Sequence, residues 1–331
     1  MINWLQFAIA AIIIIFAGRI LTGSAKTIAE QTGIGTAWAG MLMLPLVTSL
    51  PELVTSLRAV LIDAPDLALG NIFGSNLFNL ALLAVADLVH GRGALTARVN
   101  QGHILTASLV VVVVSIAALA MISRSTVQIG WVGLDTIVIA LIYFAGSRLL
   151  FKYEKKNIPA LEVSAGEGRT KSSATGPAFA SYLLAAGLII VSGVLITDAA
   201  DRIALETGLG RTFVGSLLLA VSTSLPEAVT VISAVRLGVL DMAVANIFGA
   251  NLMNMLILFW ADLFYRPAPI LSVVSGINSF SAIIVIMLTM VIIFGLVYRS
   301  QRELIRIGYD SLIVVIGYLS AIYMIFKLSS G

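Results

Sequence analysis

Ten apolar segments, each long enough to cross a lipid bilayer as a helix, constrain this chain more than any other feature. A transmembrane helix needs about 20 predominantly apolar residues, and glycines, prolines and charged clusters divide the 331 residues into segments of about that length. Only 11% of the residues are charged, whereas soluble domains carry about 25%. The sequence therefore predicts an all-α polytopic membrane protein with ten transmembrane helices. The predicted spans are 4–22, 38–62, 67–88, 104–122, 129–151, 178–197, 213–235, 242–264, 279–298 and 310–328.

The composition also excludes several classes of protein. Ten spans leave no room for a separate soluble domain, so a soluble enzyme and a nucleic-acid-binding protein are excluded. The sequence has no cysteine and two histidines, so it has no disulfide or thiolate site and we expect no zinc site. We predict no enzymatic activity and no cofactor. The expected partners are the lipid bilayer and inorganic cations.

Positively charged residues predict the orientation of the bundle. With ten spans, six of the 20 Lys and Arg residues fall on the side of the termini and fourteen on the opposite side. Short cytoplasmic loops carry the excess of positive charge, so both termini are predicted outside. The segment from Met1 to Gly18 lacks a basic n-region and a small-residue cleavage pattern, so we interpret it as the first span and not as a signal peptide.

The chain contains an internal repeat at an offset of 175 residues. The stretch TSLPELVTSLRAV at 48–60 matches TSLPEAVTVISAV at 223–235. Likewise NIFGSNLFNL at 71–80 matches NIFGANLMNM at 246–255. Because the matches keep one offset, the sequence predicts a duplication of five spans.

Five is an odd number, so the second copy must enter the membrane from the opposite side. Inverted repeats are typical of transporters, whose substrate site lies near the midplane where the repeats meet. The alternative is that duplication only builds a bundle. We predict one five-span repeat over 1–151, a cytoplasmic linker over 152–177 and an inverted repeat over 178–331.

Two acidic residues, Glu52 and Glu227, are the only ones deep within apolar segments, and they occupy equivalent positions in the repeat. A charge in the membrane interior costs several kcal/mol, and such residues mark functional sites by default. A merely structural pair is the alternative. We expect one carboxylate from each copy near the midplane.

A proline precedes each of these acids. Proline has no N–H, so Pro51 and Pro226 leave the carbonyls of Val47 and Ser222 without helical donors and bend the helix. Unpaired carbonyls inside a bilayer are tolerated where protein, water or a ligand satisfies them. These carbonyls are therefore candidate ion ligands.

Hydroxyl groups accompany the acids. Thr48 and Ser49 lie four and three residues before Glu52, on the same helical face, and Thr223 and Ser224 hold the equivalent positions in the second copy. Such hydroxyls can be ion ligands. Alternatively they bond back to the preceding turn of their own helix.

The next span of each copy contributes amides. Asn71, Ser75 and Asn79 recur every four residues along one face, and Asn246, Ala250 and Asn254 repeat the spacing. Polar residues also hold membrane helices together. We expect Asn79 and Asn254 to be ligands or near-ligands. A helix-joining role is expected for Asn71, Asn76, Asn246 and Asn251.

These positions supply oxygen ligands only. Ca2+ takes about six to eight oxygens, and two carboxylates neutralise one divalent ion. The same carboxylates could instead hold two Na+ or two protons. Because they cannot serve both sets of ions at once, the ligand set indicates ion exchange.

The repeated motifs resemble a known family. TSLPE in the second span of each half, with NIFGSNLFN and NIFGANLMN in the third, is similar to the alpha-repeats of the cation/calcium antiporter superfamily, the sodium/calcium exchanger group. The resemblance implies a secondary antiporter of a prokaryotic plasma (inner) membrane that transports Ca2+ against Na+ or H+, with both termini outside. It also implies a cation site formed by Glu52, Glu227, Thr48, Ser49, Thr223, Ser224, Ser75, Asn79 and Asn254.

This chain departs from the family pattern at several positions. Sodium-coupled relatives commonly place an Asp at one of positions 79 and 254, where this chain has Asn at both. Ala250 stands where the first copy has Ser75, and the usual glycine before Thr-Ser is Val47 or Ser222. Two carboxylates fit an exchange of two monovalent ions, or two protons, per Ca2+ better than one of three Na+.

Two other functions are compatible with the same residues. One is a Na+/H+ antiporter without calcium transport, and the other is a cation channel. For the antiporters we expect alternating access, in which the first and sixth spans move against a core that carries the two glutamates.

Overall fold

A computed structural model describes residues 2–32, 45, 48–91, 94–157, 175–236, 238, 240–299, 303–304 and 307–329, and most of this part of the chain is helical. Up to residue 157 the helices are α1 (Ile2–Thr32), α4 (Leu50–Leu61), α5 (Pro65–His90), the 3-10 helix η2 (Leu95–Ala97), α6 (His103–Ser123) and α7 (Leu134–Asn157). From residue 175 they are α8 (Thr175–Thr207), α9 (Arg211–Val214), the π-helical turn η4 (Gly215–Leu219), α10 (Ala220–Thr223), α11 (Leu225–Arg236), α12 (Leu240–Phe264), α13 (Ile270–Val273), α14 (Gly276–Tyr298) and α15 (Tyr309–Ser329).

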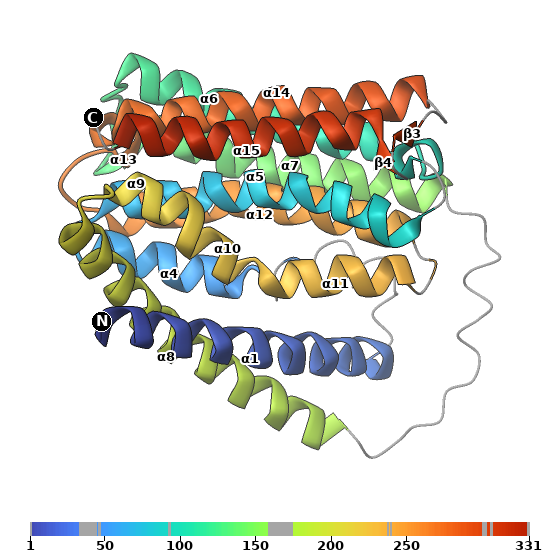
Figure 1. Cartoon of the computed structure of the whole chain (residues 1–331), viewed down its shortest axis with the longest axis horizontal. Helices are drawn as coiled ribbons and strands as arrows, with labels where there is room; N and C mark the ends of the chain where they lie inside the picture. Colours follow the sequence, from blue (N-terminus) through green and yellow to red (C-terminus); the bar gives the residue numbers. More distant parts are fainter. Residues whose placement is uncertain are drawn as a thin grey trace.

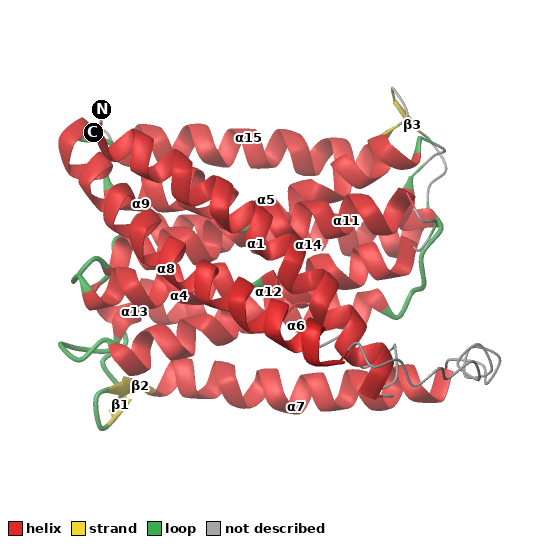
Figure 2. Ribbon diagram, turned by 90° about the horizontal axis from the view of Figure 1, so that it is seen from below, coloured by secondary structure: helices red, strands yellow, loops and turns green. Residues whose placement is uncertain are grey.

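The long helices form a bundle around α5 and α12, which are buried along most of their length (Figure 1). Helices α14 and α15 lie on one side of this pair, and α1 and α8 cross each other on the other side (Figure 1). The chain starts and finishes at the same end of the bundle (Figure 2). We call this end, where Ile2 and Ser329 lie, the terminal end.

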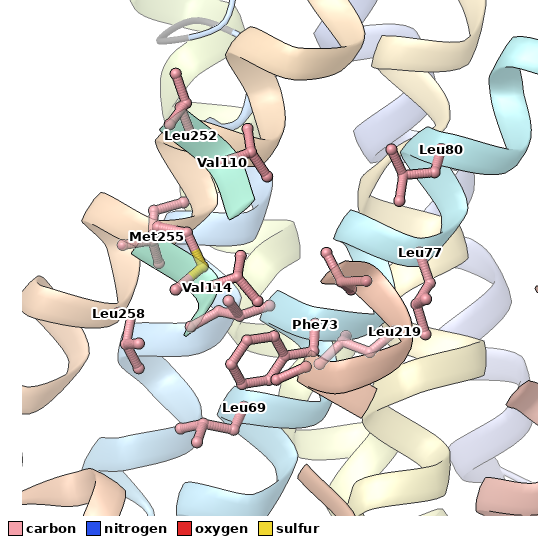
Figure 3. Packing of buried hydrophobic residues seen from close by; sticks show 14 of the residues in the cluster. Leu69, Phe73, Leu77, Leu80, Val110, Val114, Leu219, Leu252, Met255 and Leu258 are labelled. Carbon is pink, nitrogen blue, oxygen red and sulfur yellow. The ribbon is translucent and has the colours of Figure 1, made fainter. Parts of the chain in front are cut away.

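Apolar packing fills the centre of the bundle (Figure 3). Phe73 on α5, Val114 on α6 and Met255 on α12 are fully buried in one cluster. Lipid tails are as apolar as these side chains, so close van der Waals packing supplies most of their stabilising effect. Large apolar side chains such as Leu141 and Phe294 point outward and are exposed, as expected of helices that face lipid.

The structure confirms a helical membrane protein. Eight of the described helices are long and apolar enough to cross a bilayer, namely α1, α5, α6, α7, α8, α12, α14 and α15. The bent pair Arg211–Thr223 and Leu225–Arg236 makes a ninth candidate. The predicted span 38–62 contains α4, and its residues 38–44 and 46–47 lie outside the described part of the chain. The number of ten spans therefore stays a prediction.

The predicted start of the fifth span is wrong. The span predicted to begin at residue 129 begins at Leu134, because residues 128–133 form a hairpin of β1 (Gln128–Ile129) and β2 (Val132–Gly133). Gly130, with φ +68°, makes its turn, a conformation that glycine adopts without steric cost. A hairpin of β3 (Glu303–Leu304) and β4 (Ile307–Gly308) precedes α15 in the same way.

The predicted linker 152–177 begins and ends within helices. Helix α7 continues to Asn157 and α8 begins at Thr175, while residues 158–174 lie outside the described part. The end of an apolar segment marks where a helix leaves the bilayer, but the helix itself can continue further. Lys and Glu favour helix beyond that point.

A buried aspartate near the end of α12 joins distant segments of the chain. Asp262 is fully buried and accepts hydrogen bonds from the backbone N–H groups of Gly133 (2.8 Å) and Ile270 (2.7 Å). It also accepts one from the hydroxyl of Thr136, at 2.5 Å. A single carboxylate thus orders the β1–β2 hairpin, the start of α7 and the start of α13.

The residue 175 positions earlier makes the same kind of contacts. Asp87, near the end of α5, is fully buried and accepts from the backbone N–H groups of Leu95 (2.7 Å) and Gly308 (3.0 Å). These two donors are the equivalents, at the same offset, of those that bind Asp262. Each aspartate therefore ties its own segment to a hairpin of the other copy.

Removing one of these carboxylates should destabilise the fold. In Asp262→Ala, the buried backbone N–H groups of Gly133 and Ile270 lose their acceptor, whereas the Thr136 hydroxyl keeps the carbonyl of Gly133, at 3.0 Å, as an acceptor. An unsatisfied buried donor costs about 1–3 kcal/mol. We expect a loss of at least about 2 kcal/mol, measured as a lowered thermal midpoint in detergent. Gln128→Ala, which truncates an exposed side chain in β1, is the control and should stay within about 0.5 kcal/mol of the wild type. Equal midpoints for the two variants would contradict this role.

Candidate cation site

The helix that carries each deep glutamate is interrupted just before it. Ser224 separates α10 from α11, which meet at 47°. Its dihedrals are φ −88° and ψ 10°, and Ser49, at the start of α4, has φ −87° and ψ 11°. As the sequence predicts, the bend precedes Pro226, which cannot donate to the carbonyl of Ser222. The equivalent carbonyl, on Val47, lies outside the described residues.

Each glutamate is hydrogen-bonded by the serine of the other bend. The Ser224 hydroxyl donates to Oε1 of Glu52 at 2.7 Å, and the Ser49 hydroxyl donates to Oε1 of Glu227 at 3.2 Å. Both carboxylates are 1% exposed. The sequence places each serine beside the glutamate of its own helix. The structure pairs it with the other glutamate, because the bend takes the serine out of the helical register.

The two threonines bond back to their own chain, as the structural alternative predicts. Thr48 donates to the carbonyl of Pro45 at 3.4 Å, and Thr223 donates to that of Ala220 at 3.2 Å. Both hydroxyls also face a carboxyl of the opposite copy, Thr48 that of Glu227 and Thr223 that of Glu52. They therefore complete the polar lining around the two acids.

Asparagines join α5 to α12 through their amide groups. Asn79 donates from Nδ2 to Oδ1 of Asn251 at 3.1 Å, and Asn254 donates from Nδ2 to Oδ1 of Asn76 at 2.9 Å. The two bonds are equivalent at the 175-residue offset. Asn76 and Asn251 thus hold helices together, as predicted. They also fix the amide orientation of the two asparagines that are candidate ligands.

Five oxygens of the predicted set are buried without a hydrogen-bond partner among the described residues. A buried acceptor without a partner costs free energy, and a bound cation would satisfy it. These atoms are Oε2 of Glu52, Oε2 of Glu227, Oγ of Ser75, Oδ1 of Asn79 and Oδ1 of Asn254.

Asn71 has a structural role that differs from that of its equivalent. It donates from Nδ2 to the hydroxyls of Thr55 and Ser56, both at 3.0 Å, and accepts from Thr223 at 3.3 Å. It therefore joins α5 to α4 and α10. The equivalent Asn246 is equally buried, but within the described part of the chain neither of its amide atoms has a partner. The helix-joining role predicted for Asn246 is thus not observed.

The oxygen atoms of the candidate site suit a hard cation as ligands. The carboxylate of Glu52 lies close enough to Glu227 to interact with it electrostatically, and the remaining free atoms are neutral oxygens. In the described residues no three His, Cys, Asp or Glu side chains form a metal-holding group, so neutral oxygens would have to complete a coordination shell. Oxygen-only sites with two carboxylates suit Ca2+ and Na+ better than softer metals.

Comparison with known proteins gives the family. Residues 2–149 and 177–327 match the family model described as sodium/calcium exchanger protein. This chain belongs to that family. The two matched segments together contain every residue of the candidate site. A family of exchangers points to transport and not to an enzymatic reaction.

Individual relatives cover most of this exchanger-family chain. The inner membrane protein YrbG of Escherichia coli (strain K12) is 28% identical over 263 residues, which are 79% of each chain. The sodium/calcium exchanger MaX1 of Methanosarcina acetivorans is 24% identical over 352 residues, covering 96% of this chain and 99% of the relative.

Solved structures share the fold. The sodium-calcium exchanger NCX_Mj has a TM-score of 0.65 at 19% identity and covers 98% of both chains. The H+/Ca2+ exchanger CAX has a TM-score of 0.72 at 12% identity, covering 99% of this chain and 85% of that one. At these identities the likeness establishes the architecture of the bundle.

The crossed serine contacts should matter for cation binding. Ca2+ that binds the folded state raises its thermal midpoint. In Ser224→Ala, Glu52 loses a charge-assisted hydrogen bond worth about 1.5–3 kcal/mol, so we expect Ca2+ to bind at least about tenfold more weakly in a thermal-shift titration. Ser222→Ala is the matched control, because within the described part of the chain its hydroxyl bonds the carbonyl of Leu218, at 2.7 Å, and neither glutamate. Equal Ca2+ titrations for the two variants would contradict the assignment.

Proposed function

We propose that this protein is a secondary antiporter that exchanges Ca2+ for Na+ or H+ at the site between α4, α5, α11 and α12. The observation that carries the proposal is the buried pair of Glu52 and Glu227, each with one carboxylate oxygen bonded to a serine of the other copy and one oxygen unpartnered. Ser75, Asn79 and Asn254 supply further free oxygens. The remaining members of the proposed site are Thr48, Ser49, Thr223 and Ser224.

Charge balance supports exchange over simple binding. Two carboxylates neutralise one Ca2+, two Na+ or two protons, and occupancy by one set of ions excludes the other. Because positions 79 and 254 are both Asn, the site holds no third carboxylate. We therefore propose two monovalent ions or protons per Ca2+.

Reciprocal contacts support an inverted repeat. The Ser–Glu, Asn–Asn and Asp–backbone contacts each occur twice, and the residues of one contact are 175 residues from the equivalent residues of the other. Two five-span copies related by a two-fold axis in the membrane plane would produce this pattern. We propose the copies 1–151 and 178–331, joined by a cytoplasmic linker at 152–177.

The arrangement of α1 and α8 favours alternating access. These helices lie together outside the block formed by the other helices (Figure 1). Each approaches that block through a glycine, Gly18 against Pro226 and Gly193 against Val54. Smooth contacts of this kind allow one helix to slide along another. We propose that α1 and α8 move together and expose the site to one face of the membrane at a time.

The location follows from the same considerations. Apolar helices place the protein in a membrane, and one relative is named an inner membrane protein. We propose a prokaryotic plasma (inner) membrane. The excess of basic residues on one side supports an orientation with both termini outside.

The central test is ion flux into proteoliposomes. We expect calcium-45 uptake driven by an outward Na+ gradient or, separately, by a pH jump, and the driving gradient identifies the coupling ion. Glu52→Gln and Glu227→Gln should each reduce uptake to the level of empty liposomes, because the site loses a charge that neutralises Ca2+. Asp63→Asn, an exposed acid in the loop between α4 and α5, is the control and should retain wild-type uptake.

Other outcomes identify other functions. Sodium-driven proton flux without calcium uptake would show a Na+/H+ antiporter. Current that flows without any counter-ion would show a cation channel. Undiminished calcium uptake in both glutamine variants would exclude the proposed site.

A further inference from the structure

Ion pairs hold α8 to its neighbours at the terminal end. The guanidinium of Arg58, on α4, makes a bidentate contact with Asp198, on α8, at 2.8 and 3.0 Å. One turn further along α8, Asp201 pairs with Arg211, at the start of α9, at 2.6 Å. The Arg58 and Asp198 side chains are 34% and 23% exposed. Bidentate, partly buried pairs of this kind are stronger than ordinary surface ion pairs.

The 175-residue offset shows that the Arg58–Asp198 pair has no equivalent in the other copy of the repeat. The residue equivalent to Arg58 is Ser233, and the residue equivalent to Asp198 is Gly23. Serine and glycine cannot form an ion pair. The contact between α1 and α11 is the counterpart of the contact between α8 and α4, and it therefore has no ion pair at these two equivalent positions.

The same two contacts also differ in register. Gly193 of α8 packs against Val54 of α4, whereas its equivalent, Gly18 of α1, packs against Pro226 of α11. An identical register would place Gly18 against Val229, three residues further along α11. Three residues of helix correspond to about 4.5 Å. Compared with an arrangement in which both glycines contact equivalent residues, α1 and α8 are thus displaced toward the terminal end relative to α4 and α11.

We propose that the Arg58–Asp198 ion pair is a latch that holds α8 in this register. The pair biases the molecule toward the conformation in which α1 and α8 are displaced toward the terminal end. The inference rests on the alternating-access exchange proposed above. Reversing the two registers would bring Gly193 to Pro51 and Gly18 to Val229. A slide of about 4.5 Å would also carry Asp198 out of bidentate contact with Arg58.

The two registers of α1 and α8 therefore differ in free energy. In one state the ion pair forms, and in the other no equivalent pair replaces it, because the other copy carries Ser233 and Gly23. The pair therefore sets the equilibrium between states without contacting the transported ion. Arg58 and Asp198 are positioning residues for transport.

Cross-linking can measure the register directly, because the natural chain has no cysteine. A Cβ at position 193 would lie 3.1 Å from Cβ of Val54, close to the range of about 3.5–4.5 Å found in disulfides. Val54→Cys with Gly193→Cys should therefore cross-link in the register seen here. Gly18→Cys with Val229→Cys should cross-link in the reversed register.

We expect Arg58→Ser, which copies the residue of the other repeat, to slow the first cross-link and accelerate the second, each by about fivefold, as expected for loss of a strong ion pair. Exchanging the charges, with Arg58→Asp and Asp198→Arg together, should return both rates toward those of the wild type. Arg202→Ser removes an exposed charge from the same part of α8 and should change neither rate. Rates unaffected by Arg58→Ser, or not restored by the charge exchange, would overturn the latch.

A second measurement covers a failure of the Gly193→Cys variant to fold. In Val54→Cys alone, a membrane-impermeant maleimide should label the thiol severalfold faster when Arg58→Ser is added, because α8 no longer stays against it. Unchanged labelling would also overturn the proposal. Neither readout requires ion flux. Loss of the latch and failure of the proposed exchange in the calcium-45 assay are therefore separate results.

Discussion

Two carboxylates lie in the middle of the helical bundle, and their need for polar partners determines how the molecule fits together. Glu52 and Glu227 are each 1% exposed, and a buried charge without compensating contacts costs several kcal/mol. The hydroxyls that bond them come from Ser224 and Ser49, each on the segment that carries the opposite acid. For neither glutamate does this serine hydroxyl come from its own bent segment. The two bends must therefore meet, and the helices around them are arranged accordingly.

The amides around the acids present carbonyl oxygens to the proposed cation site. Asn79 and Asn254 use their N–H groups to join α5 to α12, which leaves their carbonyl oxygens free. The hydroxyl protons of Ser49 and Ser224 are also used, on the carboxylates. Apart from the Ser75 hydroxyl, which can donate as well as accept, the unpartnered atoms of the site are therefore acceptors, and acceptors suit a cation. Contacts that stabilise the fold thus also set the polarity of the site.

Contacts that occur twice and contacts that occur once have different consequences. Asp87 and Asp262 bind equivalent backbone groups at the 175-residue offset, so these ties can persist in both conformations of the proposed alternating-access cycle. The Arg58–Asp198 pair has no counterpart, because the equivalent residues cannot be charged. An approximately symmetric scaffold makes two states possible, and an interaction that breaks the symmetry makes them unequal in free energy.

The sequence by itself determined the class of the molecule and the identity of its central acids. A bilayer provides no water for polar groups, so apolar length predicts spans, and a repeated deep glutamate is conspicuous. Apolar length does not reveal the hairpin at 128–133, because a short apolar strand resembles the start of a span. Only the tertiary structure decided the partners. Ser49 bonds Glu227 and not Glu52, because a hydrogen bond depends on where a bend directs a side chain and on which distant segment it meets. Local periodicity encodes neither.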